Sequence, residues 1–182
     1  MKKIDKSRYA ILGMLLSDQP LSGYQIIKEM QGSTDYFWQE SDASIYPMLK
    51  TLENEGKVKS RTEYSGKRES RIFEITPRGK KEFLSWMEMP AEIDKRRNEF
   101  LLKLFFGGNV SKEKILQKLF SRLEKVQKLK RKFKSIECDT FSKISDEHPH
   151  KAFWYMTLRH GLIAVLAEIK WLNECIAILK KK

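Results

Sequence analysis

Cysteine, histidine and long apolar runs are scarce in this chain of 182 residues. It has two cysteines, Cys138 and Cys175, and no Cys-x-x-Cys pair, which argues against a disulfide framework and for a reducing compartment. The longest apolar run, 162–167, is far too short to span a bilayer, and the start of the chain has no apolar signal segment. We therefore expect a cytoplasmic protein without a membrane anchor.

The motifs of common catalytic sites are also missing. The sequence has three histidines and no nucleophile elbow, P-loop, His-Glu-x-x-His or paired-carboxylate motif, so we expect neither catalysis nor a cofactor. A metal sensor is an alternative, because potential zinc or nickel ligands gather in one short segment. They are Cys138, Asp139, Asp146, Glu147, His148 and His150. Polar linkers collect such residues by chance, and we favour that interpretation.

The most informative stretch begins with a predicted helix from 44 to 55. Leu49 and Leu52 fall on one face, which leaves the opposite polar face for solvent or a partner. Asp42 and Ser44 both fit as its N-cap, and Pro47 favours the later start because proline is best tolerated in the first turn. Gly56 fits the left-handed residue that ends the helix.

A basic hairpin is predicted directly after this helix, over residues 57–76 with its tip at 65–68. Residues 57–71 contain six basic and two acidic side chains. A basic hairpin with a glycine tip can lie over the phosphate backbone and place a cation in the minor groove. A helix followed by such a wing indicates a surface that binds double-stranded DNA.

The remaining predicted elements complete two domains. Helices at 9–16, 22–30 and 76–89 give residues 1–90 the order of a winged helix-turn-helix. Residues 91–182 are predicted to form an α-helical dimerisation domain, so the fold class is mainly α (α+β). The last helix carries an apolar heptad seam typical of packing along another long helix, which we assign to a second protomer. The interface residues expected on this seam are Leu158, Leu162, Val165, Ile169, Leu172 and Ile176.

The net charge of +12 supports a polyanionic partner, although most of this charge lies outside the predicted DNA-binding domain, residues 1–90. Residues 1–90 hold 15 basic and 13 acidic side chains, whereas residues 91–182 hold 21 and 11. The segment 112–134 alone has ten basic and two acidic residues. It is either a solvated helix face, which we favour, or a second DNA-contacting surface.

Six segments spread along the chain match one known family. They are Tyr-Ala-Ile-Leu-Gly-Met-Leu at 9–15, Leu-Ser-Gly-Tyr-Gln-Ile at 21–26, Ser-Ile-Tyr-Pro-Met-Leu-Lys-Thr-Leu-Glu at 44–53, Arg-Ile-Phe-Glu-Ile-Thr-Pro-Arg-Gly at 71–79, Asn-Glu-Phe-Leu-Leu-Lys-Leu-Phe-Phe-Gly at 98–107 and His-Gly-Leu-Ile at 160–163. On these segments the chain resembles the PadR family of transcriptional regulators, in its subgroup with a long C-terminal helical domain. Two departures are Lys57, expected to loosen the strand start, and Ile72, where the family often has a basic residue.

The resemblance implies a homodimeric repressor, in some members an activator, of a palindromic operator, released by a small and commonly aromatic ligand. It places Tyr24, Ser44, Tyr46, Pro47 and Lys50 of the helices at the DNA. From the composition of the hairpin, the wing residues expected to reach the DNA are Lys67, Arg68 and Arg71. Tyr24 can instead simply pack against the protein, and Pro47 can instead serve only the geometry of the helix start. Phe105, Phe106 and Trp154 are the expected effector contacts. A metal-responsive or a ligand-independent regulator is the alternative.

Overall fold

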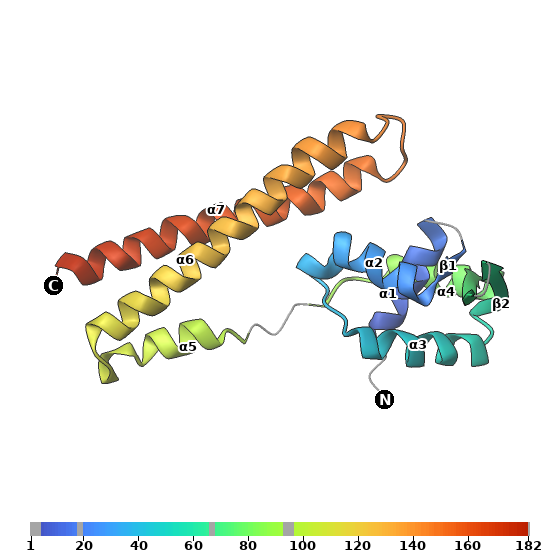
Figure 1. Ribbon diagram of the computed structural model, residues 1–182, viewed down its shortest axis with the longest axis horizontal. Coiled ribbons are helices and arrows are strands. Elements are labelled where there is room, and N and C mark those ends of the chain that lie inside the picture. The colour runs from blue at the N-terminus through green and yellow to red at the C-terminus, as the bar shows by residue number, and fades with distance from the viewer. Residues whose placement is uncertain (1–4, 18–19, 66–67, 93–96, 182) are drawn as a thin grey trace. The chain divides into compact units, whose positions relative to one another are not determined.

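Figure 1 shows the computed structural model of the chain, which describes residues 5–17, 20–65, 68–92 and 97–181. The chain divides into two compact units, Met1–Asp94 and Lys95–Lys182. The wing residue Lys67 and part of the connector after Pro90 lie outside the described residues. No helix in the described ranges is long and apolar enough to cross a bilayer.

The first unit is a winged helix-turn-helix, as predicted. Its elements are α1 (Ser7–Ser17), β1 (Leu21–Ser22), α2 (Gly23–Gly32), α3 (Asp42–Asn54), β2 (Val58–Ser65), β3 (Arg68–Ile75) and α4 (Pro77–Met87). The sheet has the order β1-β3-β2 with antiparallel neighbours. Strand β1 was not predicted, because a strand of two residues is too short to show an alternating pattern.

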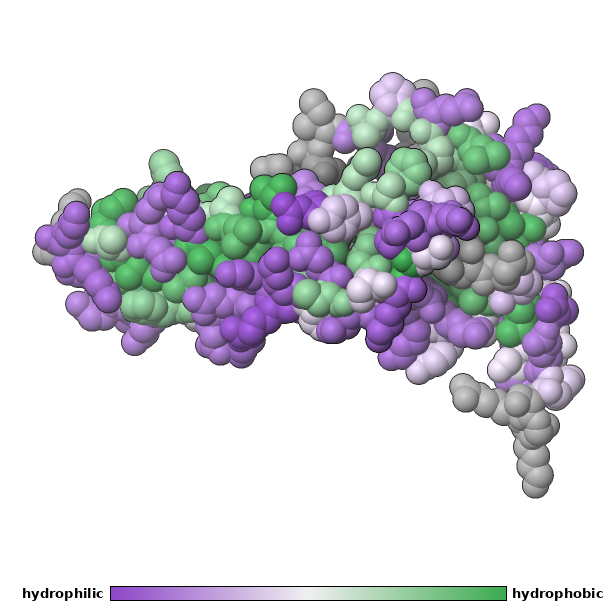
Figure 2. Space-filling model, turned by 90° about the horizontal axis from the view of Figure 1, so that it is seen from above, coloured by the Kyte–Doolittle hydropathy of each residue, from purple (hydrophilic) through white to green (hydrophobic). Residues whose placement is uncertain are grey.

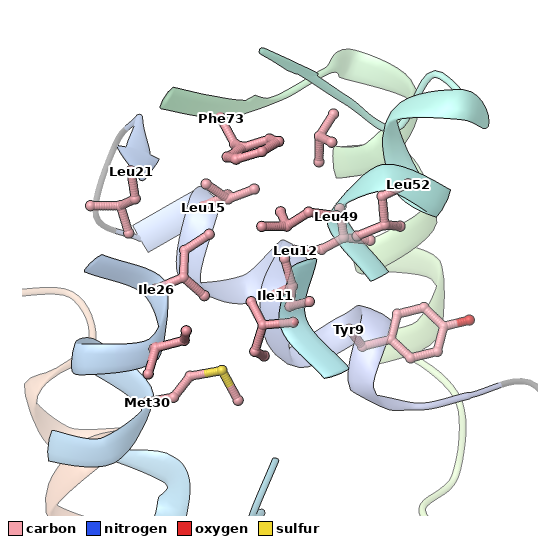
Figure 3. Close-up of a cluster of buried hydrophobic side chains, with 13 residues drawn as sticks. Tyr9, Ile11, Leu12, Leu15, Leu21, Ile26, Met30, Leu49, Leu52 and Phe73 are labelled. Carbon is pink, nitrogen blue, oxygen red and sulfur yellow. The ribbon is translucent and has the colours of Figure 1, made fainter. Parts of the chain in front are cut away.

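Apolar side chains from three helices and three strands form one core in this unit (Figure 3). Its fully buried members include Ile11, Leu12, Ile26, Ile45, Leu49, Leu52 and Val58. The rings of Tyr9 and Trp86 stack with their centroids 4.4 Å apart and join α1 to α4. The predicted apolar face of α3 is therefore buried, and the core holds its polar face toward solvent.

Local signals placed most helix ends correctly. Ser22 caps α2 in a reciprocal capping box with Gln25, and Thr76 caps α4 by accepting a hydrogen bond from the Gly79 amide at 3.1 Å. Gly56 has a φ of 68°, the left-handed conformation expected after α3.

The start of α3 differs from the prediction. Ser41 is the N-cap and the helix begins at Asp42, which places Pro47 inside the helix rather than in its first turn. Proline removes the amide that would bond to the carbonyl of Ala43, and Ala43 is exposed, so water can satisfy that carbonyl. The Ser44 hydroxyl donates to the Ser41 carbonyl at 2.7 Å and supports the first turn.

Lys57 is anchored, so the expected loosening of the strand start is not seen. Its amide donates to the Leu52 carbonyl at 2.8 Å, its carbonyl accepts from the Thr76 amide at 2.9 Å, and its ammonium pairs with Glu82. Glu82 also pairs with Arg8 at 2.8 Å. Burial lowers the pKa of Arg8, but its hydrogen bond to Glu55 and the charge of Glu82 outweigh burial and leave this pKa raised.

We predict that Gly79→Ala destabilises the first unit. A Cβ on Gly79 would lie 2.1 Å from the Lys57 carbonyl oxygen, so α4 would have to move away from the start of β2. Overpacking of this kind costs about 1–3 kcal/mol of the free energy of unfolding, which urea titration measures. Gly32→Ala is the matched control, since a Cβ there meets nothing within 4 Å. Equal stability of the two variants would refute the close approach.

The second unit consists of α5 (Glu99–Phe105), α6 (Lys112–Ser135) and α7 (Lys151–Lys181). Ser111 is the N-cap residue of α6, and α5 is capped by the Asn98 side chain. A π-helical turn at Ile136–Thr140 and a 3₁₀ turn at Phe141–Lys143 connect α6 to α7. Helices α6 and α7 lie side by side along most of their length (Figure 1).

The apolar seam of α7 packs on α6 of the same chain. Its buried residues are Leu158, Leu162, Val165, Leu172 and Ile176, and those of α6 are Ile115, Leu119, Val126 and Phe133. At Gly161 an added Cβ would lie 2.9 Å from the Phe133 ring, so glycine permits the close crossing. This corrects the predicted interface, because the seam residues, with Ile169 half-buried among them, are not a free surface for a second protomer.

Candidate nucleic-acid interface

The solvent face of α3 presents Tyr46, Pro47 and Lys50. The Tyr46 ring is 53 % exposed and rests on the backbone of α2, where a Cβ on Gly23 would lie 2.5 Å from it. Among the described residues Lys50 has neither an ion pair nor a hydrogen-bond partner. Its ammonium is therefore available to a base edge or a phosphate.

An open groove runs between the start of α2, Tyr46 of α3 and the hairpin. Tyr24, Tyr64 and Arg71 line it with Tyr46, and the three tyrosines are 53–72 % exposed. Phenol hydroxyls both donate and accept hydrogen bonds, and their rings offer flat apolar surface, so these tyrosines can contact a sugar-phosphate backbone, although two glutamates belong to the same lining. Ile72 also lines the groove, which makes this wall less basic than the family pattern implies.

Tyr64 lines the groove but was not among the DNA contacts predicted from the sequence. The register pairs Tyr64 with Glu69 and Thr62 with Arg71, so Tyr64 lies on the same face of the hairpin as Arg71. The alternation of side chains along a strand would have placed Tyr64 there once the register was known.

Carboxylates already pair with most of the described wing cations. Lys59 lies 3.2 Å from Glu74, and Arg61 lies 2.8 Å from Glu63. Arg71 lies 2.6 Å from Glu53 of α3. The basic hairpin is thus less free to neutralise phosphates than its composition predicts.

Of the predicted DNA contacts, the structure brings Tyr24, Tyr46 and Arg71 to one groove. Pro47 and Lys50 lie exposed on the same helix as Tyr46. The Ser44 hydroxyl is occupied within α3, as described above. On the wing, the backbone of Arg68 begins β3 opposite Ser65.

The predicted effector residues do not meet within one chain. Phe105 and Phe106 contact each other edge to face at the end of α5, with their centroids 5.0 Å apart. Trp154 lies at the start of α7 beside His148 and His150, at 4.8 and 5.6 Å between ring centroids. The 24 residues of α6, about 36 Å of helix, separate the two places along the chain (Figure 1).

The segment 138–150, which suggested a metal sensor, does not bring its potential metal ligands together. No group of three histidine, cysteine or carboxylate side chains converges among the described residues. Asp139 instead accepts a hydrogen bond from Ser135 at 2.6 Å. Asp146 pairs with Lys151 at 2.6 Å, and this hydrogen bond lowers the pKa of the Asp146 carboxyl.

Two family models match the chain and cover its two units in turn. The Transcriptional regulator PadR-like family matches residues 11–85, and Virulence activator alpha C-term matches residues 96–180. The negative transcriptional regulator PadR of Bacillus subtilis is 30 % identical over 96 % of this chain and 97 % of its own length. The chain belongs to the PadR-like family of transcriptional regulators.

Solved structures of PadR from Bacillus subtilis agree with this assignment. PadR in complex with operator DNA matches with a TM-score of 0.84 and 27 % identity, over 96 % of this chain and 99 % of that one. PadR in complex with p-coumaric acid matches with a TM-score of 0.79 and 25 % identity, over 97 % and 99 % of the two chains. The winged helix and the C-terminal helices are both family features.

Proposed function

We propose that this PadR-like protein is a homodimeric repressor that binds a palindromic operator through α3 and the hairpin, and that a small aromatic ligand releases it. The observation that carries DNA binding is the exposed polar face of α3 beside the tyrosine-lined groove. The Bacillus subtilis relative supports it, since it is a negative regulator and its structure was solved with operator DNA. Membership of a transcription-regulator family also argues against an enzyme.

The homodimer is proposed through an apolar surface of the second unit. On the face of α7 away from α6, four large side chains are between 46 and 64 % exposed: Phe153, Met156, Ile163 and Leu166. Helix α5 adds Leu101, Leu102 and Phe105, all of them exposed. Figure 2 shows apolar surface along the long helices at its left. Large exposed apolar side chains gathered on the face of a helix are typical of protein interfaces.

Selection of DNA from a random duplex library, followed by sequencing, tests the function. We expect the purified protein to enrich one two-fold symmetric motif, because a dimer presents two copies of α3 related by symmetry. The measured affinity should fall steeply with salt, as phosphate contacts release counterions. Enrichment of no motif at any salt concentration would contradict the proposal.

For the effector, we predict that a phenolic acid such as p-coumaric acid quenches tryptophan fluorescence and weakens operator binding. A ligand changes DNA affinity only if it binds two conformations unequally, and a coupling of about 1–3 kcal/mol is typical. Trp154, 38 % exposed beside two histidines, is the proposed reporter. Trp154→Phe should abolish the quenching, whereas Trp38→Phe, a change in the first unit, should not. Quenching and release that survive Trp154→Phe would refute this position.

A further inference from the structure

Hydrogen bonds among three side chains connect α3 to both strands of the hairpin, β2 and β3. Glu53 of α3 uses each of its carboxylate oxygens: Oε2 lies 2.6 Å from Arg71 Nη2, and Oε1 accepts from the Ser60 hydroxyl at 2.5 Å. Arg71 Nε donates to the same hydroxyl oxygen at 2.8 Å, which closes a ring. Ser60 belongs to β2 and Arg71 to β3, so one carboxylate of α3 bonds to both strands of the hairpin.

A carboxylate at position 53 would be electrostatically unfavourable for two reasons if it did not bond to the hairpin. It lies in the last turn of α3, where the partial negative charge of the helix end disfavours a carboxylate. It also adds a negative charge to the helix proposed to approach a polyanion. The Glu53 side chain is only 26 % exposed, and both of its carboxylate oxygens bond to side chains of the hairpin. The Arg71 guanidinium is fixed further by the Phe73 ring, 5.5 Å from its centroid.

We propose that Glu53, Ser60 and Arg71 fix the wing relative to α3 before DNA arrives. Arg71 is then a positioning residue for the wing rather than a phosphate contact. This inference rests on the proposed DNA binding and deepens it. Its physical benefit is preorganisation, because a wing already held in place loses less conformational freedom when the complex forms.

Glu53→Gln separates this role from simple electrostatics, because the two predict opposite signs. Loss of a negative charge beside DNA should by itself strengthen binding, whereas loss of the bridge should weaken operator binding about fivefold. Glu63→Gln is the matched control, since Glu63 pairs with Arg61 on its own strand and does not connect the wing to α3. This control should bind as tightly as the wild type or more tightly.

Two further variants sharpen the test by fluorescence anisotropy at several salt concentrations. Arg71→Gln should weaken binding without changing the salt slope, whereas loss of a phosphate contact would reduce the slope by about 1. The exchange Glu53→Arg with Arg71→Glu should recover part of the lost affinity, because it restores the pair with the same net charge. A tighter Glu53→Gln variant, or a reduced slope for Arg71→Gln, would overturn the proposal.

Hydrogen exchange tests the bridge without DNA. In Glu53→Gln the amides of β2 and β3 should exchange several-fold faster than in the wild type, while those of α1 stay unchanged. Unchanged exchange in the hairpin would overturn the bridge even if DNA binding were established. A wild-type protein that selects no duplex would refute the proposed function instead, so the two failures are distinguishable.

Discussion

Replacing Ile163 and Leu166 together with aspartate is expected to yield a folded monomer that binds the operator at least about 100-fold more weakly. Both side chains are exposed on the face of α7 proposed for the dimer, at 58 and 46 %. In a dimer these positions would bury two unpaired charges on each protomer, which costs several kcal/mol. The monomer would also lose the avidity of two linked half-sites, typically a factor of about 10² to 10⁴.

Sedimentation velocity and anisotropy measure the two effects. Gln117→Asp with Ser121→Asp is the matched control, because it adds the same charge to exposed positions of α6 and should leave a dimer. Val165→Asp with Leu172→Asp changes buried seam residues and should instead reduce the helical circular dichroism of the second unit. An Ile163 and Leu166 double variant that remains a dimer with normal affinity would contradict the assigned surface.

Lys50→Ala is expected to weaken operator binding about tenfold or more and to broaden the set of sequences bound. Lys50 is exposed on α3 and has no ion pair within the described part of the chain, and a base-directed side chain contributes about 1–3 kcal/mol. Tyr46→Phe should act in the same direction. It removes the hydroxyl but keeps the ring on Gly23, so α3 stays in place.

Selection of new motifs with each variant measures specificity, and anisotropy measures affinity. Lys80→Ala provides the control, because Lys80 is an exposed lysine of α4 and carries the same charge. It should leave the motif unchanged. If Lys50→Ala lowered affinity equally for all sequences, Lys50 would be a phosphate contact and α3 would read bases through other residues.

The local parts of the fold were predictable from local chemistry. Ser22, Gly56 and Thr76 mark helix ends through hydrogen bonds and backbone conformations that span only a few residues, so sequence spacing alone located them. The start of α3 was misplaced, because proline is tolerated inside this helix: the carbonyl that it leaves without a helical partner belongs to the exposed residue Ala43.

Contacts between distant segments were not predictable in the same way. A heptad seam indicates that α7 packs on another long helix. The pattern does not distinguish a helix of the same chain from a helix of a partner. Leu172 is fully buried against α6, which leaves the opposite face of α7 for a partner. Arg71 likewise counted as a free wing cation until the register brought it to Glu53, 18 residues away.

Hydroxyl-radical footprinting of the selected operator duplex tests the central claim most directly, because it locates the protein on both DNA strands at once. The proposed dimer, with one α3 in each of two successive major grooves, predicts two symmetric protected patches on one side of the duplex, about 34 Å apart. The protection at the outer edge of each patch should shrink when the wing is displaced by Glu53→Gln. A single protected patch at saturating protein, or protection without two-fold symmetry, would contradict the account.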